Sequence, residues 1–297
     1  MAVVATGFFD GVHLGHRKVI ETLLDAARKR GEQSLIVTFW PHPRTVLQKD
    51  ARTLRLLNSV DERRELLLKA GVDRVEVVEF TREFSSLTTE QYLKDYVIDR
   101  FGGTALLVGY DNRMGHDPAT PDFIASRAEK LGLDVIRCGK TEVSGGTVSS
   151  TRIRQALAEG YVDSAAEMLG YCYGLHGVVV AGNQLGRTLG YPTANMQVYE
   201  PLKIIPQNGV YLTLVETCGR KFYGMTNIGV RPTVGLAPIR TIETNIFDFN
   251  EDIYGLDIRI KFLARIRPER KFSCLEELKK QLEKDEVLCK NLIFAQI

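Results

Sequence analysis

The stretch at 7–16, Gly-Phe-Phe-Asp-Gly-Val-His-Leu-Gly-His, constrains the fold of this chain more than any other. It follows an apolar run at 2–5, which is typical of a buried parallel strand because it lacks polar alternation. The next residues, 17–27, carry apolar side chains at helical spacing, and Gly31 is suited to end that helix in a left-handed conformation. This segment therefore predicts a strand, a glycine-bearing turn and a helix.

Two histidines, His13 and His16, stand at the predicted start of this helix. A helix N-terminus presents free N–H groups and a partial positive charge, and imidazole donors beside it favour a bound phosphate. Glycines in the turn let the backbone approach a ligand closely. The alternative interpretation is that the glycines only turn the chain and the histidines lie on the surface. The spacing fits neither a Walker P-loop nor the dinucleotide fingerprint, so we expect a nucleotide site of another type.

Length and composition limit the class of protein. The 297 residues suffice for two domains, each with its own core. A net charge of +2 with interspersed charges gives no argument for nucleic acid as the main partner. Five scattered cysteines without a C-x-x-C pair argue against a zinc site or a disulfide framework and for a reducing compartment. With no leader pattern and no membrane-length apolar run, we expect a cytoplasmic protein without a membrane partner.

Strand and helix patterns alternate up to residue 170. Further strands are predicted at 34–39, 75–78, 105–108 and 133–136. Helices between them begin at capping boxes, Ser59 with Glu62 and Thr88 with Gln91. This alternation predicts an α/β domain with a parallel sheet and right-handed crossovers. Because ligands bind beyond the carboxyl ends of such strands, the loops after the first, second and fourth strands should meet at one crevice.

A second motif occupies residues 148–154, Val-Ser-Ser-Thr-Arg-Ile-Arg. Ser149 or Ser150 is suited to cap a helix there, and a purely structural cap is one interpretation. Hydroxyls and arginines at a helix start also bind phosphate, with two parallel hydrogen bonds available from an arginine. His42, between two prolines, is a further candidate near the crevice, although a role in the turn explains it about as well.

The pattern changes after residue 170. Short strands are predicted at 177–182, 209–215, 221–228, 239–247 and 257–263. Turns of glycine, proline and asparagine separate them with no helix between, which predicts an antiparallel β-barrel or sandwich. A helix is expected only at 273–284, opening with Ser273 and Glu276 at capping-box spacing. The domains are therefore predicted at 1–170 and 171–297.

The first motif resembles the signature of the His-x-Gly-His nucleotidyltransferases, and its full string resembles their flavin adenylyltransferase branch. The second is similar to the Ser-Ser-Thr-x-Ile-Arg motif of the same family, which holds the leaving phosphates of ATP. This resemblance implies a Rossmann-like fold with His13 and His16 as catalytic donors. It implies ATP contacts from Gly7, Phe8, Asp10, Gly15, Ser149, Ser150, Thr151 and Arg154.

The loop at 109–115 matches the family only in part. Asp111 fits the flavin-binding pattern, whereas Asn112 and Met114 stand where phenylalanines are common. Thr147 stands where relatives often have an arginine. The aromatic lining of the flavin site and part of the phosphate clamp are therefore expected to differ.

The second half resembles riboflavin kinases. The loop at 182–195 ends in Pro-Thr-Ala-Asn, like the kinase signature, and implies phosphate contacts from Gly182, Gly186 and Arg187. The same resemblance makes Thr193 and Asn195 ligands of Mg²⁺, a cation that prefers hard oxygen donors. Glu243 matches the general base of a Glu-Thr-His strand, with Asn245 in place of the histidine. Arg267 belongs to a segment like the loop that covers the flavin; residues 227–233 also match, without an assigned role.

Together, these resemblances cover almost the whole chain and identify it as similar to bifunctional riboflavin kinase/FAD synthetases. They imply a C-terminal barrel that makes FMN and ADP from riboflavin and ATP. They also imply an N-terminal domain that joins FMN and ATP into FAD and pyrophosphate. Two alternatives stay open: a single-activity adenylyltransferase of the superfamily, or a non-catalytic flavin-binding protein. The oligomeric state is not predicted.

Overall fold

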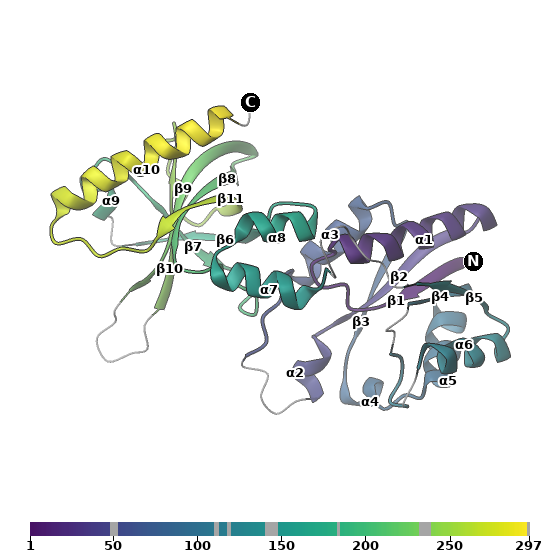
Figure 1. Cartoon of the computed structure of the whole chain (residues 1–297). Helices are drawn as coiled ribbons and strands as arrows, with labels where there is room; N and C mark the ends of the chain where they lie inside the picture. The colour runs from purple at the N-terminus through teal and green to yellow at the C-terminus, as the bar shows by residue number, and fades with distance from the viewer. Residues whose placement is uncertain are drawn as a thin grey trace. The chain divides into compact units, whose positions relative to one another are not determined.

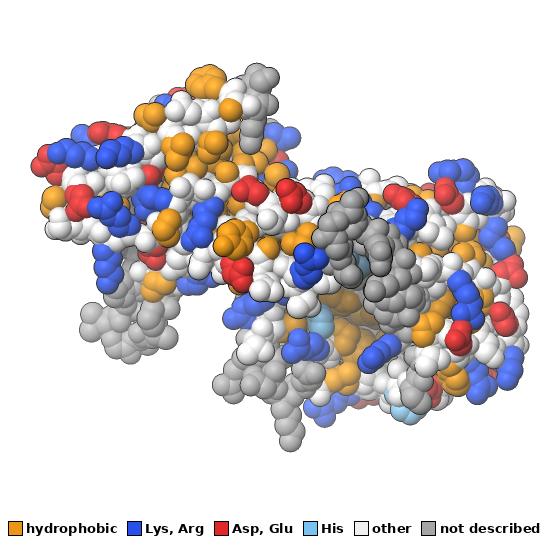
Figure 2. All heavy atoms as spheres, in the orientation of Figure 1, with side chains coloured by type: hydrophobic (Ala, Val, Ile, Leu, Met, Phe, Trp, Pro, Cys, Tyr) orange, Lys and Arg blue, Asp and Glu red, His pale blue; other side chains and the backbone are white. Residues whose placement is uncertain are grey.

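The structure is a computed structural model of the whole chain. It describes residues 1–47, 53–109, 113–117, 120–139, 148–182, 185–231 and 239–295. Two compact units make up the chain, Met1–Ser150 and Thr151–Ile297. Basic and acidic side chains are interspersed on the surface drawn in Figure 2. None of the helices in these ranges combines the length and the apolar character that a membrane crossing requires.

The first unit is built on a five-stranded parallel sheet in the order β3-β2-β1-β4-β5 (Figure 1). Its strands are β1 (Ala2–Thr6), β2 (Gln33–Trp40), β3 (Arg74–Glu79), β4 (Gly103–Gly109) and β5 (Asp134–Cys138). The sheet confirms the predicted α/β fold. Strand β1 pairs with both β2 and β4, so the strand order reverses beside it. The crevice at the carboxyl ends of these strands is where a ligand is expected in such a sheet.

Helices cover both faces of this sheet (Figure 1). Successive strand residues point to opposite faces, and each face carries its own core. Val3 packs in one core with Leu23 of α1 (Leu14–Arg30). Val4 packs in the other core with Leu93 of the π-helix η1 (Tyr92–Arg100). The other helices of this unit are α2 (Pro43–Leu47), α3 (Val60–Lys69), α4 (Arg82–Ser85), α5 (Thr89–Gln91) and α6 (Pro121–Lys130). Helix α7 (Ser150–Glu159) begins at the last residue of this unit, and α8 (Val162–Leu169) lies in the second unit.

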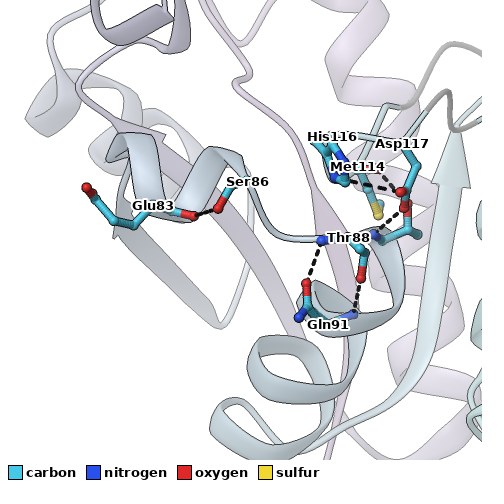
Figure 3. Close-up of polar contacts among 8 residues, drawn as sticks. Glu83, Ser86, Thr88, Gln91, Met114, His116 and Asp117 are labelled. Atoms are coloured by element: carbon cyan, nitrogen blue, oxygen red, sulfur yellow. Dashed lines mark hydrogen bonds and ion pairs between the residues drawn. The ribbon is translucent and has the colours of Figure 1, made fainter.

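The predicted helix boundaries in the first unit are confirmed by their caps. Gly31 ends α1 in the left-handed conformation, with φ of 65°. Ser59 and Glu62 form the capping box of α3. Thr88 and Gln91 exchange two hydrogen bonds at the start of α5 (Figure 3). The helix that follows Gln91 is of the π type rather than a continuation of α5, which capping chemistry alone does not predict.

The second unit contains a closed barrel with strands in the order β10-β7-β6-β11-β8-β9. The strands are β6 (Gly174–Val180), β7 (Ala194–Val198), β8 (Gly209–Thr217), β9 (Arg220–Arg231), β10 (Ile239–Ile246) and β11 (Asp257–Pro268). All neighbours pair antiparallel, which confirms the predicted barrel. Two features differ from the sequence analysis. Strand β7 was not predicted, and a short helix, α9 (Leu185–Thr188), lies between β6 and β7.

The C-terminal helix α10 (Leu275–Ala295) is longer than the predicted 273–284, and its predicted capping box is wrong. The backbone N–H and the hydroxyl of Ser273 both donate to Glu277 rather than to Glu276. The helix extends because its apolar stripe continues through Cys289, which is fully buried against Val210 of the barrel. This packing attaches α10 to the outer face of the barrel.

Candidate active sites

The loop after β1 brings the two predicted histidines into contact. His13 is the N-cap of α1, and its Nδ1 accepts a hydrogen bond from the backbone N–H of His16 at 3.4 Å. The two imidazole rings are stacked, with centroids 3.7 Å apart. A Cβ on Gly15 would lie 3.2 Å from the His13 ring, so glycine lets this ring pack against the helix start. The arrangement presents two imidazoles at a helix N-terminus, as the sequence predicts.

The same loop has a strained backbone. Phe9 and Val12 adopt positive φ angles of 53° and 39°, and Gly11 lies between them at 86°. Such conformations of non-glycine residues cost about 1–3 kcal/mol each and occur where a site needs a special geometry. A Cβ on Gly7 would lie 3.0 Å from the Phe9 ring. The loop is therefore shaped tightly around its own side chains.

Asp10 joins this loop to two other segments. Its carboxylate accepts hydrogen bonds from the backbone N–H groups of Leu57, at 3.0 Å, and Asn58, at 3.3 Å. Its carbonyl oxygen accepts one from the hydroxyl of Ser150 at 3.0 Å. The first motif thus lies against the start of the second, with Ser149 next to this contact. Thr151 and Arg154 follow on α7.

Phe8 and His42 lie side by side at the ends of β1 and β2. Their ring centroids are 4.2 Å apart in an edge-to-face arrangement. The carbonyl oxygen of Phe8 accepts hydrogen bonds from Thr38 and Arg63. Arg63 was not predicted from the sequence, and its side chain is fully buried. The sequence gives only a weak indication that Arg63 is buried: position 63 falls on the helix face that also carries Leu67, four residues later.

The environment of His16 sets its protonation state. Burial, followed by the neighbouring His13 and Arg63, holds the pKa of His16 well below its ordinary value of 6.5. In the unfolded chain this imidazole regains its ordinary pKa, so the unfolded state binds more protons below pH 6.5. Stability of the first unit should therefore fall as the pH drops below about 6.5.

Urea unfolding of the first unit, followed by a probe in that unit, checks this expectation. The urea concentration at the midpoint is compared between pH 7.5 and pH 5.5. The His16→Gln variant should lose part of the difference between the two midpoints, because glutamine does not titrate. An equal difference in the variant and the unaltered chain would contradict it.

The segment after β4 is described only in part. Asp111 and Asn112 lie outside the described residues, as does Thr147. Met114 is buried in the core with Tyr92, and its carbonyl oxygen accepts a hydrogen bond from the Thr89 hydroxyl at 2.7 Å. Asp117 accepts a hydrogen bond from the backbone N–H of Thr89 (Figure 3), which lowers the pKa of Asp117. These bonds attach the segment to the start of α5.

Two cavities of the second unit meet at Thr193. The larger has a volume of about 390 Å³, and Thr244 and Arg187 line it. The smaller, of about 240 Å³, is lined by Glu243, Asn227 and Arg267 among others. Thr193 lines both. Because neighbouring strand residues point to opposite faces, Glu243 and Thr244 on β10 reach different cavities.

Glu243 is the middle residue of a polar row across three strands. It pairs in register with Asn195 of β7 on one side and with Asn227 of β9 on the other. Directly paired residues in a sheet place their Cβ atoms about 4.5–5.5 Å apart on one face. Asn227, the first residue of the 227–233 motif, is therefore a neighbour of Glu243.

The glycines of the 182–195 loop permit close approaches. A Cβ on Gly182 would lie 2.2 Å from Nδ2 of Asn195, and a Cβ on Gly186 would lie 2.2 Å from the carbonyl oxygen of Tyr191. Asn245, where the related motif has histidine, donates to the carbonyl oxygen of Pro192 at 2.8 Å. Asn245 therefore holds the turn that presents Thr193. Residues 183–184 of this loop are outside the described ranges.

Arg267 lines the smaller cavity and is also held by α10. Its Nε lies 2.9 Å and 3.1 Å from the two carboxylate oxygens of Asp285, which is 3% exposed. Two residues later, Glu269 accepts hydrogen bonds from Asn208 and from the backbone N–H of Val230. Asp285 was not predicted from the sequence, since an acidic residue in a charged helix indicates a solvated face. Within the described ranges, no group of three His, Cys, Asp or Glu side chains could hold a metal ion.

A histidine pair at a helix start in a parallel α/β unit, and a glutamate in one of two adjoining cavities of a barrel, fit a two-domain phosphate-transferring enzyme. A family model described as FAD synthetase matches residues 1–152, and one described as riboflavin kinase matches residues 169–293. The chain belongs to the family of bifunctional riboflavin kinase/FMN adenylyltransferases.

Relatives of that name match along nearly the whole chain. Those from Listeria monocytogenes and Bacillus subtilis are both 36% identical, and that from Escherichia coli is 35% identical. Each match covers 96% of this chain and 90% of the relative. A solved structure titled a macrolide-efflux protein, from Streptococcus pneumoniae, is 33% identical with a TM-score of 0.89. It covers 98% of this chain and 94% of its own.

Proposed function

We propose that this chain carries out two successive ATP-dependent reactions that convert riboflavin into FAD. In the barrel, the 5′-hydroxyl oxygen of riboflavin attacks the γ-phosphorus of ATP, and ADP leaves. In the α/β unit, a phosphate oxygen of FMN attacks the α-phosphorus of a second ATP, and pyrophosphate leaves. The observation that supports this most directly is the match of two family models, one to each half of the chain.

In the kinase reaction we assign the general base to Glu243. It lines the smaller cavity, whose apolar and aromatic residues suit a flavin, and it lies one residue from the larger cavity. A carboxylate there would orient the riboflavin hydroxyl and accept its proton as the bond to phosphorus forms. We assign the larger cavity, which Arg187 lines, to ATP, and the glycine-rich loop with Gly182 and Gly186 to its phosphates. Thr193, which lines both cavities, is placed where the transferred phosphoryl group would pass.

Mg²⁺ fits the oxygen-bearing side chains beside this point. Thr193 and Asn195 would supply two hard oxygen ligands, and ATP phosphates and water would supply the rest, as is usual for this ion. The absent side chain at Gly182 leaves room for Asn195 to take its position. When bound, the ion would neutralise developing charge on the transferred phosphoryl group.

Substituting Gly182 by alanine tests this metal assignment. The new Cβ would overlap the Asn195 carboxamide, a flexible group that moves aside without disturbing the strands. We expect the Mg²⁺ concentration for half-maximal kinase rate to rise by about tenfold, with FMN adenylylation unchanged. Gly139→Ala, in the first unit, is the control for the kinase rate, since Gly139 has no positive φ and a Cβ there meets nothing within 4 Å. An unchanged Mg²⁺ requirement in Gly182→Ala would remove Asn195 from the metal site.

In the adenylyl transfer, no protein nucleophile is required. His13 and His16 would donate hydrogen bonds to charge that develops on the ATP phosphates. Ser149, Ser150, Thr151 and Arg154 would hold the leaving phosphates, and Gly7, Phe8, Asp10 and Gly15 would shape the nucleotide loop. Asp111 is assigned to the flavin from its motif, and Arg267 to the flavin of the kinase site.

We assign residues 1–170 to the adenylyltransferase and residues 171–297 to the kinase. Gly170 ends α8 in the left-handed conformation, and the first barrel strand begins at Gly174, so this boundary divides no strand. A cytoplasmic location is favoured by the five free cysteines, which suit a reducing compartment.

Incubation of the purified chain with ATP, Mg²⁺ and either riboflavin or FMN, followed by chromatography, tests the function. We expect FMN and then FAD from riboflavin, and FAD from FMN. A single-activity adenylyltransferase would make FAD from FMN only. A flavin carrier would bind flavin and consume no ATP.

A further inference from the structure

A fully buried arginine, Arg63, lies behind the loop that follows β1. It is the fourth residue of α3, and its side chain has no exposed surface. Its Nη1 donates to the carbonyl oxygen of Phe8 and its Nη2 to that of Phe39, both at 3.0 Å. Its Cζ lies 3.9 Å from the centre of the Phe8 ring. The guanidinium therefore joins the first nucleotide motif to the end of β2.

The charge of this guanidinium is balanced by few groups. Within the described ranges, no carboxylate lies at ion-pair distance from Arg63, and its buried Nε has no hydrogen-bond partner. Asp10 attracts it electrostatically, although that carboxylate is bonded to the amides of Leu57 and Asn58. Burial lowers the pKa of Arg63 to about 10, which leaves it charged at neutral pH. A buried cation held mainly by carbonyl oxygens is unfavourable until an anion binds nearby.

His16 in the same site does not add a second fixed charge. The rings of His13 and His16 stack at 3.7 Å, and the buried Nδ1 of His16 has no hydrogen-bond partner among the described residues. The titratable and charged groups that act on His16 are His13 on its own loop and Arg63 on α3, and with burial they keep its pKa low. A neutral imidazole still donates one N–H. His16 thus supplies a directed hydrogen-bond donor, and Arg63 supplies the fixed positive charge.

We propose that Arg63 is a positioning residue of the adenylyl-transfer site: the fixed cation whose counter-anion is the polyphosphate of ATP or the pyrophosphate product. The proposal rests on the proposed function of the first unit. Attraction between charges extends over several ångströms in a partly dehydrated site, so Arg63 acts without touching the phosphates. At the same time it holds the Phe8 carbonyl, and a role confined to that hydrogen bonding is the competing explanation.

Three variants of the full chain separate these explanations. Arg63→Lys keeps the charge, Arg63→Gln keeps hydrogen-bond donors without charge, and Arg64→Gln removes an exposed arginine one residue away. Calorimetric titration with pyrophosphate and the KM for ATP in FMN adenylylation are measured for each. For Arg63→Gln we expect the dissociation constant for pyrophosphate and the KM for ATP to rise about tenfold or more. For Arg63→Lys we expect both to rise about threefold or less. Arg64→Gln should match the unaltered chain, and riboflavin phosphorylation should not change in any variant.

Titration of the histidines by NMR gives a second measurement, one that a purely hydrogen-bonding role of Arg63 would not change. The pKa of His16 should rise in Arg63→Gln and stay low in Arg63→Lys. Undiminished pyrophosphate affinity in Arg63→Gln, or tighter binding by Arg63→Gln than by Arg63→Lys, would overturn the proposal. So would unfolding of the first unit in Arg63→Lys while Arg64→Gln stays folded. If the unaltered chain binds pyrophosphate but makes no FAD, the proposed function fails, and the affinities still decide the role of Arg63.

Discussion

Replacing Glu243 by alanine is expected to abolish FMN formation from riboflavin and to leave the conversion of FMN to FAD intact. Glu243 lines the flavin-sized cavity, in register between Asn195 and Asn227. A second carboxylate that lines this cavity, Glu269, is held by hydrogen bonds from Asn208 and the Val230 N–H. Loss of a positioned base typically lowers a rate by about 10²–10⁴-fold. The measurement is the initial rate of each reaction, assayed separately with riboflavin or FMN as the acceptor.

Two further variants make this result interpretable. Glu243→Gln preserves the shape of the side chain and should be almost as inactive as Glu243→Ala if proton transfer is the main role. Glu276→Gln alters an exposed carboxylate on α10 that pairs with Lys280, and should retain both rates. Loss of both reactions in a folded Glu243→Ala protein would contradict the assignment of two separate sites.

His16→Ala is expected to have the reverse effect, with FAD formation lost and FMN formation kept. The imidazole stands at the N-terminus of α1, stacked on His13, where a donor would meet charge developing on the ATP phosphates. Removing one such donor commonly costs about 10²–10³-fold in rate. Initial rates with FMN and ATP, and separately with riboflavin and ATP, measure the two effects.

A surface histidine of the same unit is the matched control. The side chain of His116 is 58% exposed, and His116→Ala should keep both activities near those of the unaltered chain. Circular dichroism and the urea midpoint establish that His16→Ala remains folded. Full FAD synthesis by the folded His16→Ala variant would exclude this imidazole from the chemistry.

The elements that sequence patterns predict well are those with local causes. Capping boxes at Ser59 and Thr88 and the left-handed Gly31 depend on a few neighbouring residues, and the structure contains all three. Strand β7 shows the limit. Its residues, Ala194–Val198, do alternate between apolar and polar, but five residues after a proline-containing turn are too few to separate from the turn. Its pairing with β6 and β10 makes it a strand.

Departures from the related motifs acquire a meaning only in three dimensions. Asn245 replaces a histidine, and its carboxamide holds the Pro192 carbonyl beside Thr193. Met114 replaces an aromatic residue and fills the core under η1. The capping box predicted at Ser273 fails because Glu277, one residue further on, accepts both hydrogen bonds. None of these choices is visible in the spacing of residues along the chain.

By itself, the sequence determined the two-domain division into a parallel α/β half and an antiparallel barrel, and the motifs by which the family is recognised. These follow from periodicity, from caps and from short runs of residue types, all of which act over a few neighbours. Only the tertiary structure decided which charges are buried: Arg63 behind the first motif and Asp285 against Arg267. Burial of a charge depends on what other segments pack against it, and a sequence pattern shows only which face of a helix it occupies.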